Sequence, residues 1–230
     1  MSGLMSSPIL WLTATLIVFE GADRLSRRSG RHPLCHPVLL ATPVLIGVLL
    51  LTRTPYSTYY SATQMLVFLL GPAVVGLAVP IWAQRAVIRR LAVPIALALA
   101  AGAVTAVVSA VGILALFGAP REILASIAPR ATTTPVAMEM ASQLGGVPAL
   151  AAVIVLFAGV FGAMVATPLL NALKIDDFRA RGFATGVSAH GIGAARAFQV
   201  DATAGAFASL GMALNAVATA TLLSFLALLS

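Results

Sequence analysis

The sequence predicts an all-α fold: a polytopic helical membrane protein with broken or re-entrant helices, forming one integral membrane domain over residues 1–230. Of its 230 residues, 60% are hydrophobic and only 9% are charged, whereas soluble domains have about 25% charged residues. Long apolar runs recur along the whole chain, as membrane-spanning helices require. These runs do not alternate between polar and apolar residues, as the strands of a membrane β-barrel do.

Eight apolar segments follow one another along the chain. The first, fourth, sixth and eighth are typical of ordinary membrane spans, and the second is so short that it needs its flanking residues to cross. The third, fifth and seventh contain proline or glycine at positions where a continuous helix does not favour them. The segments are 8–23, 37–52, 61–84, 88–117, 123–144, 147–173, 183–198 and 201–229.

The three unusual segments predict interrupted helices. Proline removes a backbone donor and clashes with the preceding turn, and inside a membrane the freed carbonyls persist only where protein or water satisfies them. Interruptions of this kind indicate the substrate site of a transporter. The expected helix breaks are Gly71, Pro72 and Pro80 in the third segment, Pro129 and Pro135 in the fifth, and Gly191 and Gly193 in the seventh.

The third and fifth segments also resemble each other. An alignment that places Pro72 on Pro129 also places Gly102 on Gly159. It predicts an internal repeat with units at about 61–117 and 123–173. The alternative is a chance likeness between broken apolar helices.

Basic loops predict the orientation in the membrane, and they account for much of the net charge of +7 without a nucleic-acid partner. Loops 24–31 and 85–90 are rich in arginine and are expected in the cytoplasm. Loop 174–181, with Lys174, Arg179 and Arg181, also favours the cytoplasm. That placement requires segment 123–144 to enter and leave on one side. If the segment spans fully, the loop lies outside.

Four ionisable residues lie in apolar surroundings. A charge within the membrane costs at least about 2.5–3.5 kcal/mol, so each is a functional candidate. The alternatives are structural, because Arg130 can extend to an interface and Glu139 can form a charge pair with an arginine. These residues are Arg130, Glu139, His190 and Arg196.

The stretch "PRATTTP" predicts a cradle for a small carboxylate substrate. Arginine binds carboxylates through a planar fork, and the hydroxyls of Thr132, Thr133 and Thr134 follow Arg130 closely. If a half-helix begins there, Pro135 lies in its first turn, and the free N–H groups favour an anion.

Segment 183–198 places His190 near Arg196. Histidine has an ordinary pKa near neutral pH, so His190 is a candidate for carrying a coupled proton, and both side chains are candidates for contacting the substrate. The flanking glycines permit a backbone break or simply tight helix packing. Common catalytic motifs are absent from the sequence, which indicates that the protein is not an enzyme and needs no cofactor or metal.

Three motifs resemble those of the LrgB/CidB family of bacterial inner-membrane proteins. They are "LGPAVVGLAVP" (70–80), "PRATTTPVAMEMASQLGG" (129–146) and "RGFATGVSAHGIGAARAF" (181–198), and their order and spacing also match. Ala194 stands where the family commonly has threonine, and Gln199 stands where it often has an acid. A hydroxyl at 194 or a carboxylate at 199 is therefore not expected here.

The resemblance implies two functions. Family members were described as holin- or antiholin-like modulators of murein hydrolase activity and autolysis that act with a small LrgA/CidA membrane partner. The related plastid protein is a glycolate/glycerate translocator. The carboxylate chemistry of Arg130 favours a secondary transporter of pyruvate, glycolate, glycerate or lactate, with proton coupling, and the autolysis modulator is the alternative. We also expect a homodimer, since two-fold symmetry is the commonest arrangement.

Overall fold

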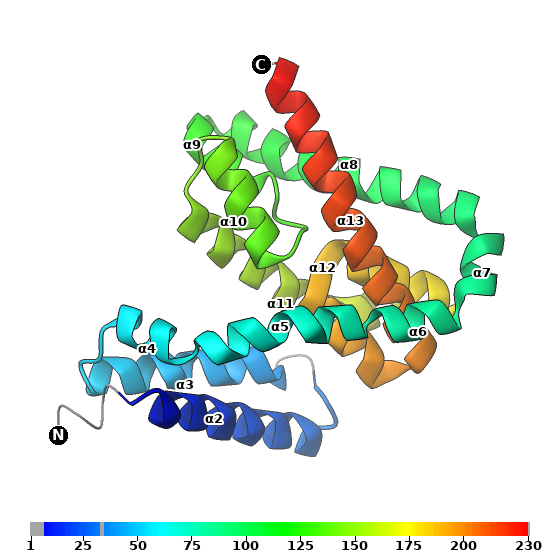
Figure 1. The fold of residues 1–230 in the computed structure, drawn as a ribbon. Helices are drawn as coiled ribbons and strands as arrows, with labels where there is room; N and C mark the ends of the chain where they lie inside the picture. The colour runs from blue at the N-terminus through cyan, green and yellow to red at the C-terminus, as the bar shows by residue number, and fades with distance from the viewer. Residues whose placement is uncertain (1–6, 33–34, 230) are drawn as a thin grey trace. The chain divides into compact units, whose positions relative to one another are not determined.

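The computed structural model describes residues 7–32 and 35–229, with side chains described as far as residue 227. These residues form helices joined by short turns, which confirms the all-α fold class (Figure 1). The helices are α2 (Pro8–Arg28), α3 (Pro37–Leu51), α4 (Tyr56–Ala62), α5 (Gln64–Gly76), α6 (Ala78–Ala83), α7 (Arg85–Arg90), α8 (Ala92–Leu116), α9 (Arg121–Ile127), α10 (Thr134–Gln143), α11 (Pro148–Ala172), α12 (Phe178–Val200) and α13 (Ala202–Leu229).

The chain divides into two compact units, Met1–Leu77 and Ala78–Ser230. In the first unit, α2 packs against α3 and α4. Trp11 of α2 is only 2% exposed, and its ring meets Tyr59 of α4 edge to face with 5.8 Å between ring centroids. Thr15 and Tyr59 share a hydrogen bond of 3.1 Å between their hydroxyls. An aromatic and hydroxyl contact therefore fixes α4 on α2.

The second unit is built around α12 and α13, which share the most extensive helix contact of this unit. Helix α13 also packs against α6, α8 and α10, while α11 packs against α9, α10 and α12. The backbones of α12 and α13 approach so closely that a side chain at Gly182 would collide with the Ala204 carbonyl, and one at Gly186 with the Ala208 carbonyl. Such glycines allow membrane helices to pack without a gap.

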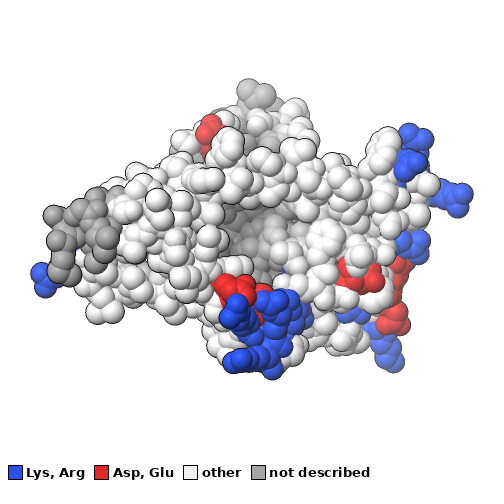
Figure 2. All heavy atoms as spheres, turned by 60° about the horizontal axis from the view of Figure 1, so that its bottom comes forward, with Lys and Arg blue, Asp and Glu red and all other residues white. Residues whose placement is uncertain are grey.

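Among the described residues, four helical stretches are long and apolar enough to cross a membrane: Gln64–Ala83, Ala92–Leu116, Pro148–Ala172 and Ala202–Ala227. Large apolar side chains on them face outward, as Phe157 and Phe161 of α11 do with 67% of each exposed. Most of the face in Figure 2 carries neither acidic nor basic side chains. A surface of this kind suits contact with lipid, as expected of a membrane protein.

The interruption in the third predicted segment falls at Leu77, between α5 and α6. Helix α5 continues through Gly71 and Pro72, so these residues do not end it. Pro80 lies in the first turn of α6. Because a proline disturbs the turn that precedes it, Pro80 gives a physical reason for the turn at Leu77.

Helices α8 and α11 have the same length of 25 residues. The two glycines that the repeat alignment pairs both face α12. A Cβ on Gly102 would lie 2.9 Å from Val187, and a Cβ on Gly159 would lie 2.5 Å from the His190 ring. The internal repeat stays a prediction, and these equivalent contacts are compatible with it.

Candidate functional site at the meeting of two helical hairpins

The fifth predicted segment folds as a hairpin of two short helices. Helix α9 has 7 residues and α10 has 10, which at 1.5 Å per residue gives lengths of about 10 and 15 Å. Neither reaches across a hydrocarbon core of about 30 Å. Residues 128–133 between them are non-helical. Pro129 lies in this connection and Pro135 lies in the first turn of α10, so both prolines occupy the interruption.

Ser126, in the last turn of α9, is fully buried. Its hydroxyl donates to the carbonyl of Glu122 at 2.7 Å and accepts from the N–H of Val147 at 2.8 Å. Val147 directly precedes α11, so after α10 the chain returns to the last turn of α9. This geometry supports the re-entrant alternative, in which loops 85–90 and 174–181 face the same side.

The seventh predicted segment, within α12, is also a hairpin, and its reversal lies at His190. This residue has φ 41° and ψ −133°, in the middle of an otherwise helical segment. A non-glycine residue held in such a region costs on the order of 1–3 kcal/mol, so the surrounding contacts must hold it there. The two arms fold back closely, because a Cβ on Gly193 would lie 2.7 Å from the Thr185 carbonyl.

The backbone reverses at His190 itself, and the glycines that follow it allow close packing. Gly193 leaves room for the close approach of the two arms. Gly191 has more space, since its nearest neighbour is the Met212 sulfur, 3.7 Å from an added Cβ. The break that the sequence placed at Gly191 and Gly193 thus begins one residue earlier, at His190.

The His190 ring is buried, with 4% of the residue exposed. Its Nε2 lies 3.0 Å from the Val155 carbonyl of α11. Because a carbonyl only accepts hydrogen bonds, Nε2 carries a proton and donates it here. The ring also lies over Gly159, where any side chain would displace it. His190 therefore attaches the tip of the α12 hairpin to α11.

Asn215, at the middle of α13, joins the two hairpins. It is fully buried, and its Nδ2 donates to the carbonyl of Ala131 at 2.8 Å and to that of Val187 at 3.2 Å. Ala131 belongs to the connection between α9 and α10, and Val187 lies three residues before His190. Thr219 approaches the Asn215 Oδ1 at 3.4 Å. One side-chain amide thus bridges both interruptions.

The three threonines of the predicted cradle lie around this bridge. Thr132 is 1% exposed, and its hydroxyl donates to the Pro129 carbonyl at 2.8 Å, so it stabilises the connection itself. Thr133 is the N-cap of α10 and makes no side-chain capping bond. Thr134 begins α10. The free N–H groups of a helix N-terminus therefore lie at the tip of the first hairpin, as anion binding requires.

Arg130 is half-buried in the same connection. Among the residues that the structure describes, no side chain forms a hydrogen bond or ion pair with its guanidinium. Glu139 is exposed on α10 and accepts a hydrogen bond of 2.8 Å from Gln143. The structure thus brings Glu139 to Gln143 and does not pair it with Arg130.

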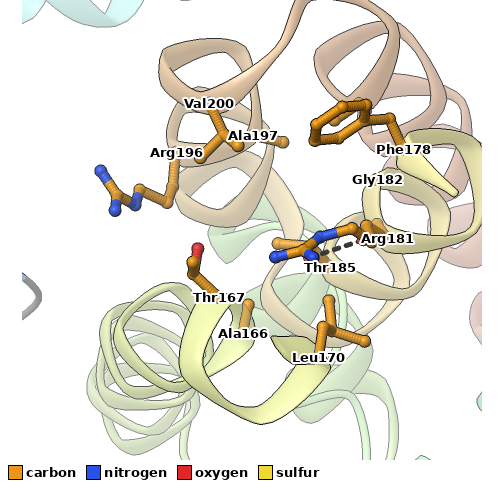
Figure 3. Close-up of a pocket in the computed structure, with 11 residues that line it drawn as sticks. Ala166, Thr167, Leu170, Phe178, Arg181, Gly182, Thr185, Arg196, Ala197 and Val200 are labelled. Carbon is orange, nitrogen blue, oxygen red and sulfur yellow. Dashed lines mark hydrogen bonds between the residues drawn. The ribbon is translucent and has the colours of Figure 1, made fainter. Parts of the chain in front are cut away.

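Arg196 lies apart from this cluster, on the second arm of α12. It donates to Gln199 at 3.3 Å and lines a pocket at the open end of the α12 hairpin (Figure 3). The predicted site residues therefore fall into two groups. Those around residues 129–135 and His190 lie near the Asn215 bridge, and Arg196 belongs to the base of the second hairpin.

The comparisons with known proteins decide the family. The model of the LrgB-like family matches residues 15–229. The chain belongs to the LrgB-like family. It is 34% identical to the Bacillus subtilis protein "Uncharacterized protein YwbG" over 218 residues, which cover 95% of this chain and 96% of that protein. It is 28% identical to "Holin-like protein CidB" of Staphylococcus epidermidis over 221 residues, 96% of each chain. No solved structure matches the chain significantly.

Sequence reasoning missed the residues that hold the hairpins together. Asn215, Ser126 and Val155 were not among the candidates. Asn215 carried a signal, since an isolated amide at the centre of an apolar helix needs a polar partner. Val155 carried none, because it contributes only its backbone carbonyl.

Proposed function

We propose that this chain is a secondary carrier of small 2-oxo and 2-hydroxy monocarboxylates in the bacterial inner membrane. The observation that carries the proposal is the buried amide of Asn215, which joins the non-helical connection at Ala131 to the arm of α12 that leads into the reversal at His190. Irregular backbone at membrane depth persists where protein or a water-filled cavity satisfies it, and carriers bind their substrates beside such broken helices. Pyruvate, glycolate, glycerate and lactate share the required chemistry.

Arg130 and the N-terminus of α10 form the substrate cradle in this proposal. The guanidinium binds the carboxylate through its planar fork. The uncapped first turn of α10 adds N–H donors, and the hydroxyls of Thr133 and Thr134 reach the 2-oxo or 2-hydroxy oxygen. An uncharged analogue of the same shape lacks the group that Arg130 recognises, so it is not carried.

His190 has two roles in the proposed mechanism. Its Nε2 proton is committed to the Val155 carbonyl and holds the second hairpin in place. A coupled proton therefore binds at Nδ1, the other ring nitrogen. Because the ring supports the hairpin tip, loading and unloading that proton alters the stability of the tip. This is the route by which a proton gradient drives transport.

The second candidate function is a holin-like pore or autolysis modulator, and the names of the holin-like CidB relatives favour it. A pore that passes large solutes has no need of a polar bridge between two re-entrant hairpins. A carrier requires one, because its substrate site must close on each side in turn.

Counterflow of radiolabelled pyruvate into proteoliposomes that contain the purified chain alone tests this proposal. The carrier predicts saturable uptake that unlabelled glycolate, glycerate or lactate inhibits and that methyl pyruvate does not inhibit. A trapped fluorescent dextran stays inside the vesicles. Uptake that rises linearly with pyruvate concentration, together with loss of the dextran, contradicts the carrier and supports the pore.

A further inference from the structure

The base of the α12 hairpin encloses a pocket that lies apart from the Asn215 bridge (Figure 3). Its free volume is about 20 Å³, where one water needs roughly 10–15 Å³. The pocket therefore suits one small polar group, with the rest of a ligand in its open mouth. Its walls include Thr167 and Leu170 of α11, Arg181 and Thr185 of the first arm of α12, and Arg196 and Ala197 of the second arm.

Arg181 is held in this pocket by neutral oxygen atoms. Its Nη1 donates to the Ile175 carbonyl at 3.1 Å, and its Nη2 donates to the Asn171 Oδ1 at 2.7 Å. Within the described part of the chain, Arg181 forms no ion pair with a carboxylate. These bonds fix the guanidinium in place, use two of its five N–H groups and leave its charge without a fixed counter-ion.

Arg179, two residues before Arg181, shows the opposite arrangement. Its Nη2 lies 2.6 Å from the Asp177 carboxylate, and the hydrogen bond from Arg179 holds the pKa of Asp177 below its ordinary value. Arg179 therefore already has an anionic partner and does not line the pocket. Arg179 serves as the matched control for Arg181.

Thr167 contributes a hydroxyl from the opposite wall. In Figure 3 this hydroxyl is directed toward the side of the pocket where the arginines lie. No hydrogen bond joins it to any other described residue. The neighbouring Thr185 differs, since its hydroxyl donates to the Arg181 carbonyl at 2.7 Å. Thr167 is thus a donor in place for a ligand, on the wall of the pocket that faces the fixed cation.

We propose that this pocket is a second carboxylate site, in which Arg181 supplies the charge and Thr167 the hydroxyl donor, with Arg196 at the rim. His190 lies nine positions along the helix from Arg181, a distance of about 13 Å, so this site is distinct from the tip site. In the proposed carrier this pocket is an entry site, where a monocarboxylate binds before it reaches the cradle around Arg130. That role rests on the proposed function.

The pocket's shape limits what it takes. One planar carboxylate can meet the remaining N–H groups of Arg181 and the Thr167 hydroxyl. Inorganic phosphate has four oxygen atoms in a tetrahedron, so it fits a free volume of about 20 Å³ less well than one planar carboxylate does. A ligand here also touches both arms of the hairpin, because Arg181 and Ala197 line the same pocket from opposite arms. Binding therefore joins the two arms at the open end of the α12 hairpin.

Equilibrium dialysis of radiolabelled pyruvate against the full chain in detergent micelles tests this site without requiring transport. An Arg130→Ala background removes the tip cradle, and we expect pyruvate binding to persist there. Adding Thr167→Val should weaken that binding about tenfold, the scale of one hydrogen bond in a charged site. Adding Arg181→Gln should weaken it by at least that much. Arg179→Gln and Thr221→Val are the matched controls and should leave binding unchanged.

Thr167→Val leaves both hydrogen bonds of Arg181 intact, so it keeps the test valid if Arg181→Gln fails to fold. Pyruvate binding that disappears entirely with Arg130→Ala, or that Thr167→Val leaves unchanged, overturns the second site. Phosphate binding as tight as that of pyruvate overturns the carboxylate assignment. If the second site is overturned but pyruvate counterflow is still saturable, the proposed carrier function is retained. Binding that depends on Arg181 and Thr167 without any counterflow supports the site and contradicts the carrier.

Discussion

Replacing Asn215 with leucine should separate the two hairpins, because the change keeps the branching of the side chain and removes both donors. The Ala131 and Val187 carbonyls, now bonded at 2.8 and 3.2 Å, lose their partner inside the bundle. Hydrogen bonds between membrane helices contribute about 0.6–1.7 kcal/mol each, and an orphaned buried carbonyl costs about 1–3 kcal/mol. The two bonds together therefore predict a loss of roughly 2–4 kcal/mol.

Unfolding of the purified protein by increasing SDS in mixed micelles measures this loss, and pyruvate counterflow measures its functional effect. Counterflow should fall on the order of tenfold or more, because the hairpin tips are no longer positioned. Thr219→Val is the matched control. Its contact with Asn215 is long, at 3.4 Å, so we expect a change of about 0.5 kcal/mol or less. Asn215→Leu with the stability and transport of the control would refute the role of the bridge.

Three further predictions concern the hairpin tips. Gly159→Ala should lower the free energy of unfolding by about 1–3 kcal/mol in the same SDS assay, because the added Cβ would lie 2.5 Å from the His190 ring. Gly112→Ala is the control and should change it little, because the space around Gly112 is open. Equal effects of the two substitutions would contradict the packing of His190 on Gly159. His190→Gln should flatten the pH dependence of counterflow while pyruvate binding in dialysis is retained; an unchanged pH profile excludes His190 as the proton carrier. Arg130→Ala should weaken pyruvate binding at the tip by about 2–5 kcal/mol, and Arg130→Lys by less. Adding Glu139→Ala should not restore transport, and recovery in that double variant would show that Arg130 only balances a charge.

The periodicity and the prolines predicted much of the fold. Segments 88–117, 147–173 and 201–229 correspond to α8, α11 and α13, each within a few residues. The expected half-helix after "PRATTTP" is α10, which begins at Thr134. These predictions succeeded because they depend on local chemistry: long apolar runs form helices in lipid, and a proline in the first turn suits a helix start.

Other features depend on tertiary contacts and were not accessible from local chemistry. Pro72 lies within a helix that continues through it, since one missing donor does not end a helix that its remaining bonds hold. The reversal falls at His190 and not at the glycines, because the Val155 carbonyl and the space over Gly159 hold that ring. The Asn215 bridge joins residues 84 positions apart, and no spacing rule connects them.

The roles of the charged residues were also predictable only in part. The sequence predicted functional roles for Arg130 and Arg196, because both are charges in apolar surroundings. The structure places them on different hairpins, and it adds Arg181, which looked like part of an ordinary basic loop. Loop composition alone does not distinguish an arginine that orients the protein from one held at a pocket by neutral oxygens.

In the proposed carrier the substrate occupies the tip where the two hairpins meet, so bound substrate should protect a cysteine placed at that tip. Cys35 is the only cysteine in the sequence, so Cys35→Ser provides a cysteine-free background. The test variant is Thr133→Cys, at the N-cap of α10. The control is Ser142→Cys, at an exposed position of α10. Pyruvate at ten times the half-saturating concentration of the Thr133→Cys variant should slow its reaction with a water-soluble maleimide by about tenfold, and methyl pyruvate should not. The control should react at the same rate with or without pyruvate. Equal rates for Thr133→Cys in the presence and absence of pyruvate, in a variant that still catalyses counterflow, would contradict a substrate site at the meeting of the hairpins.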